Sequence, residues 1–117
     1  MLVKYQLMGK PVILGTLQEA QDLLHFCLGC EGEIIPGRHF RDELANEGLS
    51  FGDVWVVLNT GQIVDPPEHD VRTGEWKYRV EGFESGGKWL VIVFSFKTIS
   101  RVFLITIFSV EEKRRSV

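Results

Sequence analysis

Two stretches in the second half of the chain, residues 88–96 and 102–109, are apolar at almost every position. Both are rich in β-branched and aromatic residues and too short to cross a membrane, so the pattern predicts two β-strands. A strand with one face in solvent alternates apolar and polar residues, whereas an unbroken apolar run is typical of a sheet covered on both faces. We expect helices on one face and a further cover on the other: the N-terminal segment, a second copy or a partner protein.

A third stretch, residues 76–83, alternates as expected for a strand with one charged face. The two sets of side chains are Trp76, Tyr78, Val80 and Gly82 on one face, and Lys77, Arg79 and Glu81 on the other. Residues 62–65 are predicted to form a further strand, and residues 85–87 have the composition of a hairpin turn. The sequence therefore predicts a four-stranded antiparallel sheet.

Three helices are expected before this sheet. Residues 16–19 form a capping box, and the apolar residues that follow have helical spacing until Gly29. A second helix is predicted over about residues 39–47, and a third begins after Ser50 and ends at Gly61. The expected fold class is α+β, with N-terminal helices packed on the sheet.

The 117 residues are enough for a single domain with its own hydrophobic core. We expect an N-terminal extension over residues 1–35, with strands at residues 2–7 and 12–14 and an extended link at residues 33–37. A core over residues 36–110 and a flexible charged tail over residues 111–117 follow. The chain begins without a basic and apolar leader, so we expect a cytoplasmic protein without membrane segments.

Charge is spread unevenly along the chain, whose formal net charge is −3. Residues 1–75 carry 5 Lys/Arg and 12 Asp/Glu, a balance of −7, whereas residues 76–117 carry 8 and 4, a balance of +4. The overall sign argues against purely electrostatic binding of nucleic acid, but the basic sheet segment is compatible with contact to phosphate.

Cys27 and Cys30 form a CxxC pair, which is a pattern of redox and zinc sites. A redox pair of the thioredoxin type opens a helix, where the helix dipole lowers the thiol pKa, whereas this pair closes a helical pattern. A structural zinc site needs four ligands, and His25 and His39 would have to complete it. We therefore expect two thiols without a metal or other cofactor.

His39 and Arg41 are predicted in the first turn of the second helix, where free backbone N–H groups favour an anion. Metal-independent RNA cleavage needs a general acid and base, and cations for the charge that develops on phosphorus. His39 would serve as acid or base and Arg41 as a phosphate ligand, with Arg79 from the sheet as a second cation. The alternative is a helix start with ordinary surface side chains.

The predicted loop over residues 65–75 carries His69, Arg72 and several carboxylates. Arg72 and Lys77 are candidate substrate-binding residues because they would supply further cations for the phosphate charge, although a solvated loop has the same composition. Tyr78 is a further candidate, since aromatic residues interleaved with cations are typical of base-stacking surfaces. Strand alternation places such rings opposite the cations and so also allows them to be core residues.

Residues 39–107 taken together resemble a small bacterial family of unknown function whose members are similar to the RelE, BrnT and MqsR toxins. The residues that carry the resemblance are His39 and Arg41, Gly48–Ser50, Asp53 and Val54, Gly61, Tyr78–Gly82, Gly86 and Gly87, and Ile105 and Thr106. The resemblance implies a toxin-like fold with helices followed by an antiparallel sheet. It also implies mRNA cleavage, on or off the ribosome, and a neighbouring antitoxin that masks the sheet.

Two positions depart from the resemblance: Glu43 and Glu47 stand where similar sequences tend to have arginine. The acidic isoelectric point of 5.6 also contrasts with the basic character of ribosome-dependent toxins. The hypothesis from the sequence is a metal-independent endoribonuclease with RNA as substrate and an antitoxin as partner. The alternative is a catalytically inactive module of the same fold that binds a protein or forms a homodimer through its apolar sheet.

Overall fold

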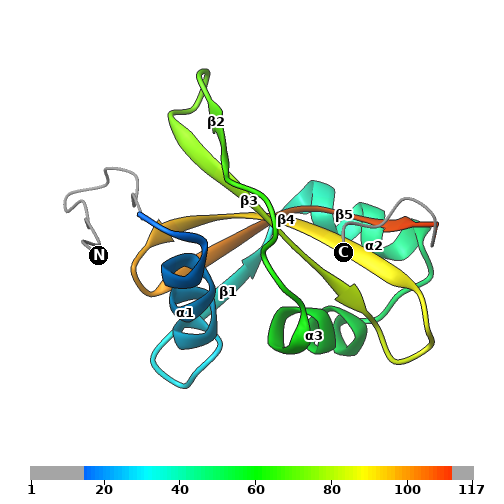
Figure 1. Cartoon of the computed structure of the whole chain (residues 1–117). Helices are drawn as coiled ribbons and strands as arrows, with labels where there is room; N and C mark the ends of the chain where they lie inside the picture. The colour runs from blue at the N-terminus through cyan, green and yellow to red at the C-terminus, as the bar shows by residue number, and fades with distance from the viewer. Residues whose placement is uncertain (1–14, 112–117) are drawn as a thin grey trace.

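The structure, a computed structural model, describes residues 15–111. Its elements, shown in Figure 1, are α1 (Leu17–Cys27), β1 (Glu33–Pro36), α2 (Arg38–Asn46), α3 (Phe51–Thr60), β2 (Glu68–Asp70), β3 (Glu75–Phe83), β4 (Trp89–Thr98) and β5 (Arg101–Val110). The strands predicted at residues 2–7 and 12–14 and the tail from residue 112 lie outside the described residues. No helix within the described part is long and apolar enough to cross a membrane.

The fold is α+β, as predicted, but the sheet has five strands in the order β1-β5-β4-β3-β2 and is mixed. The expected four-stranded antiparallel sheet is therefore wrong in two places. The predicted link at residues 33–37 contains β1, which pairs in parallel with residues 101–104 of β5. Opposite charges accompany this pairing, because Glu33 and Arg101 are register partners and form a 3.0 Å ion pair.

The second difference concerns the segment before β3. The predicted strand at residues 62–65 makes only one bridge, Gln62 to Glu81. Two prolines at positions 66 and 67 follow it, and proline cannot donate a hydrogen bond to a neighbouring strand. Pairing resumes at β2, inside the predicted loop, where residues 68–70 lie antiparallel to residues 75–77.

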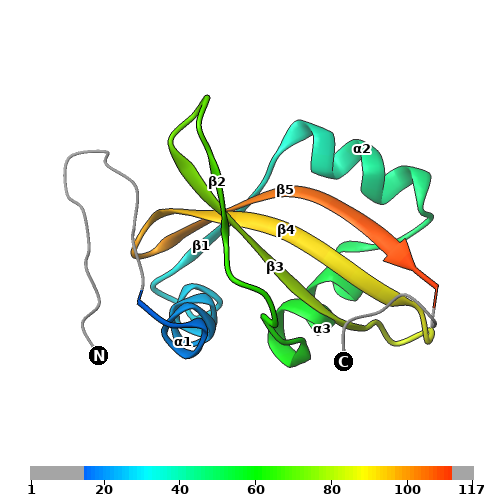
Figure 2. The same ribbon diagram turned by 45° about the horizontal axis from the view of Figure 1, so that its top comes forward.

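The three helices take different positions on the sheet. Figures 1 and 2 show α1 and α3 on the same face, where α3 contacts β3 and β4, and α1 contacts α3 and β5. Helix α2 contacts β5 and runs beside the outer edge of that strand, beyond the end of β1 (Figure 2). The C-terminal end of α2 is held by Glu47, whose side chain accepts a 3.0 Å hydrogen bond from Ser109 and whose carbonyl accepts one from Lys88.

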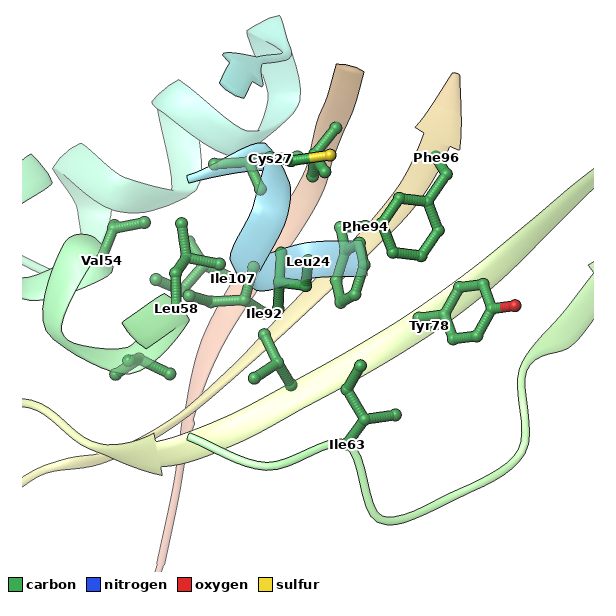
Figure 3. Packing of buried hydrophobic residues seen from close by; sticks show 14 of the residues in the cluster. Leu24, Cys27, Val54, Leu58, Ile63, Tyr78, Ile92, Phe94, Phe96 and Ile107 are labelled. Carbon is green, nitrogen blue, oxygen red and sulfur yellow. The ribbon is translucent and has the colours of Figure 1, made fainter. Parts of the chain in front are cut away.

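The core lies between the sheet and the helices α1 and α3 (Figure 3). Alternate residues of the three long strands supply it, together with the apolar stripes of the helices. The largest fully buried side chains include Phe40, Phe94, Leu24, Leu58, Leu90, Ile92, Leu104 and Ile107. The alternation predicted for β3 holds for Tyr78 and Val80, which are buried in this core, and for Lys77 and Arg79, which are not. Glu81, predicted on the same face as these cations, is buried as well.

Local capping explains where α3 begins. The Ser50 hydroxyl accepts a hydrogen bond from the Asp53 N–H at 3.3 Å, and the Asp53 carboxylate accepts one from the Ser50 N–H at 2.9 Å. These bonds satisfy donors that the first helical turn leaves unpaired. The backbone hydrogen bond from Ser50 also lowers the pKa of the Asp53 carboxyl.

Candidate functional site

The face of the sheet opposite α1 and α3, called the open face here, carries no described helix (Figure 1). Strand register places its residues in rows: Arg79, Val93 and Thr106; Glu81, Val91 and Phe108; Phe83, Trp89 and Val110. Most of these side chains are apolar or aromatic. The continuous apolar runs in β4 and β5 thus supply both the core and the open face.

Two aromatic side chains of the open face are substantially exposed: Phe83 at 47% and Phe108 at 38%. Trp89 is half-buried and packs edge-to-face against Phe83, with ring centroids 4.9 Å apart. Aromatic pairs in this geometry favour each other beyond the area that they bury. The open face therefore presents a rigid aromatic surface built on strands rather than on loops.

A cavity of about 340 Å³ lies where this aromatic pair meets the segment between α3 and β2. It is lined by Thr60, Gln62, Val64, Glu81, Gly82, Phe83 and Trp89. The Glu81 side chain is only 5% exposed, and its carboxylate accepts a 3.0 Å hydrogen bond from the indole N–H of Trp89. The cavity is thus lined by one acidic residue, Glu81, and by two aromatic residues, Phe83 and Trp89.

The catalytic candidate Arg79 and the candidate substrate-binding cations Arg72 and Lys77 lie around the pairing of β3 with β2. Arg79 forms a 3.0 Å ion pair with Glu68, and Lys77 forms a 2.9 Å ion pair with Asp70. Arg72 lies 3.8 Å from Asp70 and is strongly exposed. The structure therefore brings these three cations into one region, and each has a carboxylate beside it.

The pKa of Asp70 reports this electrostatic arrangement. A side-chain hydrogen bond from Lys77, followed by a backbone hydrogen bond from Arg72, lowers the Asp70 pKa from 3.8 to about 2. Because the folded-state pKa is depressed, the resulting stabilisation is complete above pH 3.8 and is lost as pH falls towards 2.

We expect Lys77→Gln to raise the pKa of Asp70 towards 3.8, because glutamine replaces the charged hydrogen-bond donor with a neutral and shorter one and also removes the coulombic attraction. An NMR titration of the Asp70 carboxyl carbon measures this change directly. Lys97→Gln is the matched control, since Lys97 pairs with Glu75 instead. An unchanged Asp70 titration in the Lys77 variant would contradict the assignment of Lys77 as the main cause.

The three residues predicted to be catalytic do not form one compact group. His39 and Arg41 are both exposed on α2, and about 200° of helical rotation separates them because each residue turns by about 100°. Arg79 lies on β3, which is separated from α2 by β4 and β5. Two strand spacings already amount to about 10 Å, so His39 and Arg79 cannot act on one phosphate in this arrangement.

The start of α2 has its own local chemistry. Gly37 is the N-cap and provides no side-chain hydrogen bond, and no acidic residue lies in the first turn. Arg38, His39 and Arg41 surround this helix start. Free backbone N–H groups together with cations are suited to a phosphate group.

The other sequence candidates have clear positions. Tyr78, predicted to bind substrate, is 3% exposed and stacks on Phe94 with centroids 5.7 Å apart, and burial raises its pKa. His69 lies against Trp76 on the β2–β3 pair, with ring centroids 4.6 Å apart. Tyr78 is thus part of the core, on the side of the sheet opposite the Arg79 cation.

The CxxC pair is split between two environments. Cys27 is buried, its thiol lies 3.6 Å from the Ile99 carbonyl, and burial raises its pKa to about 11. Cys30 is exposed. Within residues 15–111, no group of three His, Cys, Asp or Glu residues is arranged to hold a metal ion.

A second cavity, between α1 and the end of α3, is rich in side-chain amides. Gln21 dominates it: its amide donates to the Gly61 carbonyl at 3.3 Å and accepts from the Ile63 N–H at 2.9 Å. These bonds attach α1 to the segment after α3. The Gln21 amide therefore has a structural role.

The sequence reasoning missed the pairing of Glu81 with Trp89. The sequence places Glu81 on the charged face of β3 and Trp89 in an apolar run, and neither pattern indicates that the two side chains meet. The hairpin turn at residues 85–87 was the available signal, because a tight turn there makes Phe83 and Trp89 cross-strand partners. Arg38 was also missed, although it directly precedes the predicted second helix.

Comparison with protein families gives a match over the part of the chain that contains both the α2 start and the open face. A family model described as "Domain of unknown function (DUF4258)" matches residues 37–109, which is more than half of the chain. Searches of curated proteins and of solved structures found no match. The elements from α2 to β5 therefore form the family's domain, and the chain belongs to the DUF4258 family.

Proposed function

We propose that this chain is a protein-binding domain that recognises its partner through the open face of the sheet. The observation that carries the proposal is the aromatic surface of Phe83, Trp89 and Phe108 on a face without a described helix. Exposed aromatic residues on a rigid scaffold are typical centres of protein interfaces. Large exposed apolar side chains rimmed by polar residues mark interaction sites on folded domains.

The charges support the same conclusion. Arg79, Lys77 and Lys97 are each paired with a carboxylate, Glu68, Asp70 and Glu75 respectively. An RNA phosphate would have to displace these carboxylates or share their cations. The charged rim beside an aromatic centre instead matches the usual organisation of a protein interface.

The test is binding by the purified chain with substitutions on the open face. If the wild type self-associates in sedimentation experiments, we expect Phe83→Arg and Phe108→Arg to abolish that self-association. If the wild type is monomeric, we expect the same two substitutions to abolish its specific co-purification with a partner. Phe26→Arg and Phe51→Arg are matched controls, because these side chains are 50% and 37% exposed on α1 and α3. Identical behaviour of the open-face and control variants would refute the proposal.

A second candidate, the metal-independent endoribonuclease, is favoured by the start of α2. The helix N-terminus has no side-chain cap, and Arg38, His39 and Arg41 lie around it. Such a combination of free N–H groups and cations can bind a phosphate. In this candidate His39 acts as general acid or base, and Arg79 contacts a different phosphate of the same strand. RNA cleavage lost in an Arg38→Ala/Arg41→Ala variant, but retained in Phe83→Arg, would favour it over the protein-binding domain.

A further inference from the structure

The residues that line the cavity beside Phe83 and Trp89 favour a positively charged ligand. Its aromatic walls come from adjacent register partners of β3 and β4, so strand pairing holds them in place. Its buried acidic group, Glu81, comes from the same strand as Phe83, two residues earlier. A carboxylate and aromatic ring faces both attract organic cations, and both disfavour anions.

The position of Glu81 is determined by backbone contacts as well as by its side chain. Its N–H and carbonyl form the bridge with Gln62, at 3.0 and 2.9 Å. The indole of Trp89 can only donate, so its bond to the carboxylate orients one oxygen. Gln62 and Val64 also line the cavity, so residues from the segment between α3 and β2 form part of its wall.

We infer that this cavity is a binding site for a cationic side chain, the guanidinium of arginine or the ammonium of lysine. The inference deepens the proposed function, because it names the group with which a partner is anchored at the rim of the open face. The planar guanidinium fits the site best, since it can pair with a carboxylate and stack on an aromatic ring at once. A neutral ligand of the same shape would lack both attractions.

Two sources of such a side chain exist. One is a basic residue of another protein. The other is the chain itself, because Lys113, Arg114 and Arg115 follow Val110 closely in the sequence and Val110 is the cross-strand partner of Trp89. A tethered group is present at a high effective concentration, so a basic segment in the same chain would compete with an added cation.

The experiment is an NMR titration of the full chain with N-acetyl-arginine amide, and with N-acetyl-citrulline amide as its uncharged isostere. We expect a saturable shift of the Trp89 indole N–H with the arginine probe alone. The indoles of Trp55 and Trp76 are internal controls because neither residue lines the cavity. No saturable shift in any form of the chain, or equal shifts with both probes, would overturn the inference.

Variants identify the group that attracts the cation. We expect Glu81→Gln to lower the affinity for the arginine probe by about tenfold or more, because a hydrogen bond to a charged group is replaced by a neutral one. Glu68→Gln removes the same charge from outside the cavity and should bind like the wild type. If Glu81→Gln fails to fold, the comparison of the two probes in the wild type still decides.

A Lys113→Ser/Arg114→Ser/Arg115→Ser variant distinguishes the sources. Tighter probe binding than in the wild type assigns the cavity to this chain's own basic residues, and equal binding assigns it to another protein. Failure of the cation-binding inference can be told apart from failure of the protein-binding proposal. The probe titration needs no partner, whereas the Phe108→Arg test concerns a residue outside the cavity.

Discussion

Replacing Phe40 with alanine is expected to lower the free energy of unfolding by about 3–5 kcal/mol. Phe40 is completely buried, and every other residue of α2 is at least partly exposed, so its ring is the main attachment of this helix to the core. Removal of the ring leaves a cavity that closely packed neighbours refill only in part. Urea unfolding followed by circular dichroism measures the loss as a lower midpoint at an unchanged slope.

Phe26→Ala is the control for this prediction. Phe26 is also a helical phenylalanine, but it is 50% exposed on α1, so its removal should change stability by less than about 1 kcal/mol. Equal losses for the two variants would show that α2 is not held by Phe40. Such a result would also mean that Phe40 does not hold the candidate phosphate-binding site at the start of α2 in place.

Replacing Gly61 with alanine is expected to cost about 3 kcal/mol through overpacking. A Cβ atom at this position would lie 2.6 Å from the Val57 carbonyl and 2.7 Å from the Glu81 carbonyl, and both are backbone atoms. Gly61 is where α3 ends against β3, with Gly82 on the facing strand also in close contact. Only glycine allows the two backbones to approach so closely.

Gly52→Ala is the matched change within the same helix. There the added Cβ would meet only the Ser50 hydroxyl, at 3.4 Å, and alanine favours helix, so the variant should be neutral or more stable by up to about 1 kcal/mol. Thermal unfolding of the two variants compares them directly. Because Gly61 adjoins Gln62 and Glu81, its substitution should also disturb the cavity beside Phe83 and Trp89, whereas Gly52→Ala should not.

The capped helices were predicted closely because their signals are local. Ser50 and Asp53 lie three residues apart, and the hydrogen bonds between them form within one turn. The same holds for Thr16, whose side chain accepts from the Glu19 N–H at the start of α1. Such bonds depend on the immediate sequence and on little else.

Strand pairing between distant segments was predicted less well. Residues 33–36 were expected to be a link, and they became β1 because an edge of β5 is available 68 residues later in the register Glu33 to Arg101. A short segment containing proline carries too weak a local preference to indicate that pairing. The same reason explains why β2 appeared in a predicted loop.

For the candidate site, the sequence identified types of residue but not their neighbours. It placed Lys77 and Arg79 on one face, which the structure confirms, but the ion pairs with Asp70 and Glu68 depend on β2. The distance between α2 and β3 depends on the strand order, which alternation does not encode. The endoribonuclease and its catalytic residues therefore stay predictions.

The sequence by itself determined the α+β class, the helix starts and the two-faced apolar character of β4 and β5, because spacing and caps act over a few residues. The tertiary structure decided that β1 pairs in parallel, that α2 lies at the edge of the sheet, and that the Glu81 carboxylate accepts a hydrogen bond from the Trp89 indole. These outcomes depend on which segments compete for the same strand edge and on the entropy of closing long loops. Both are properties of the whole chain.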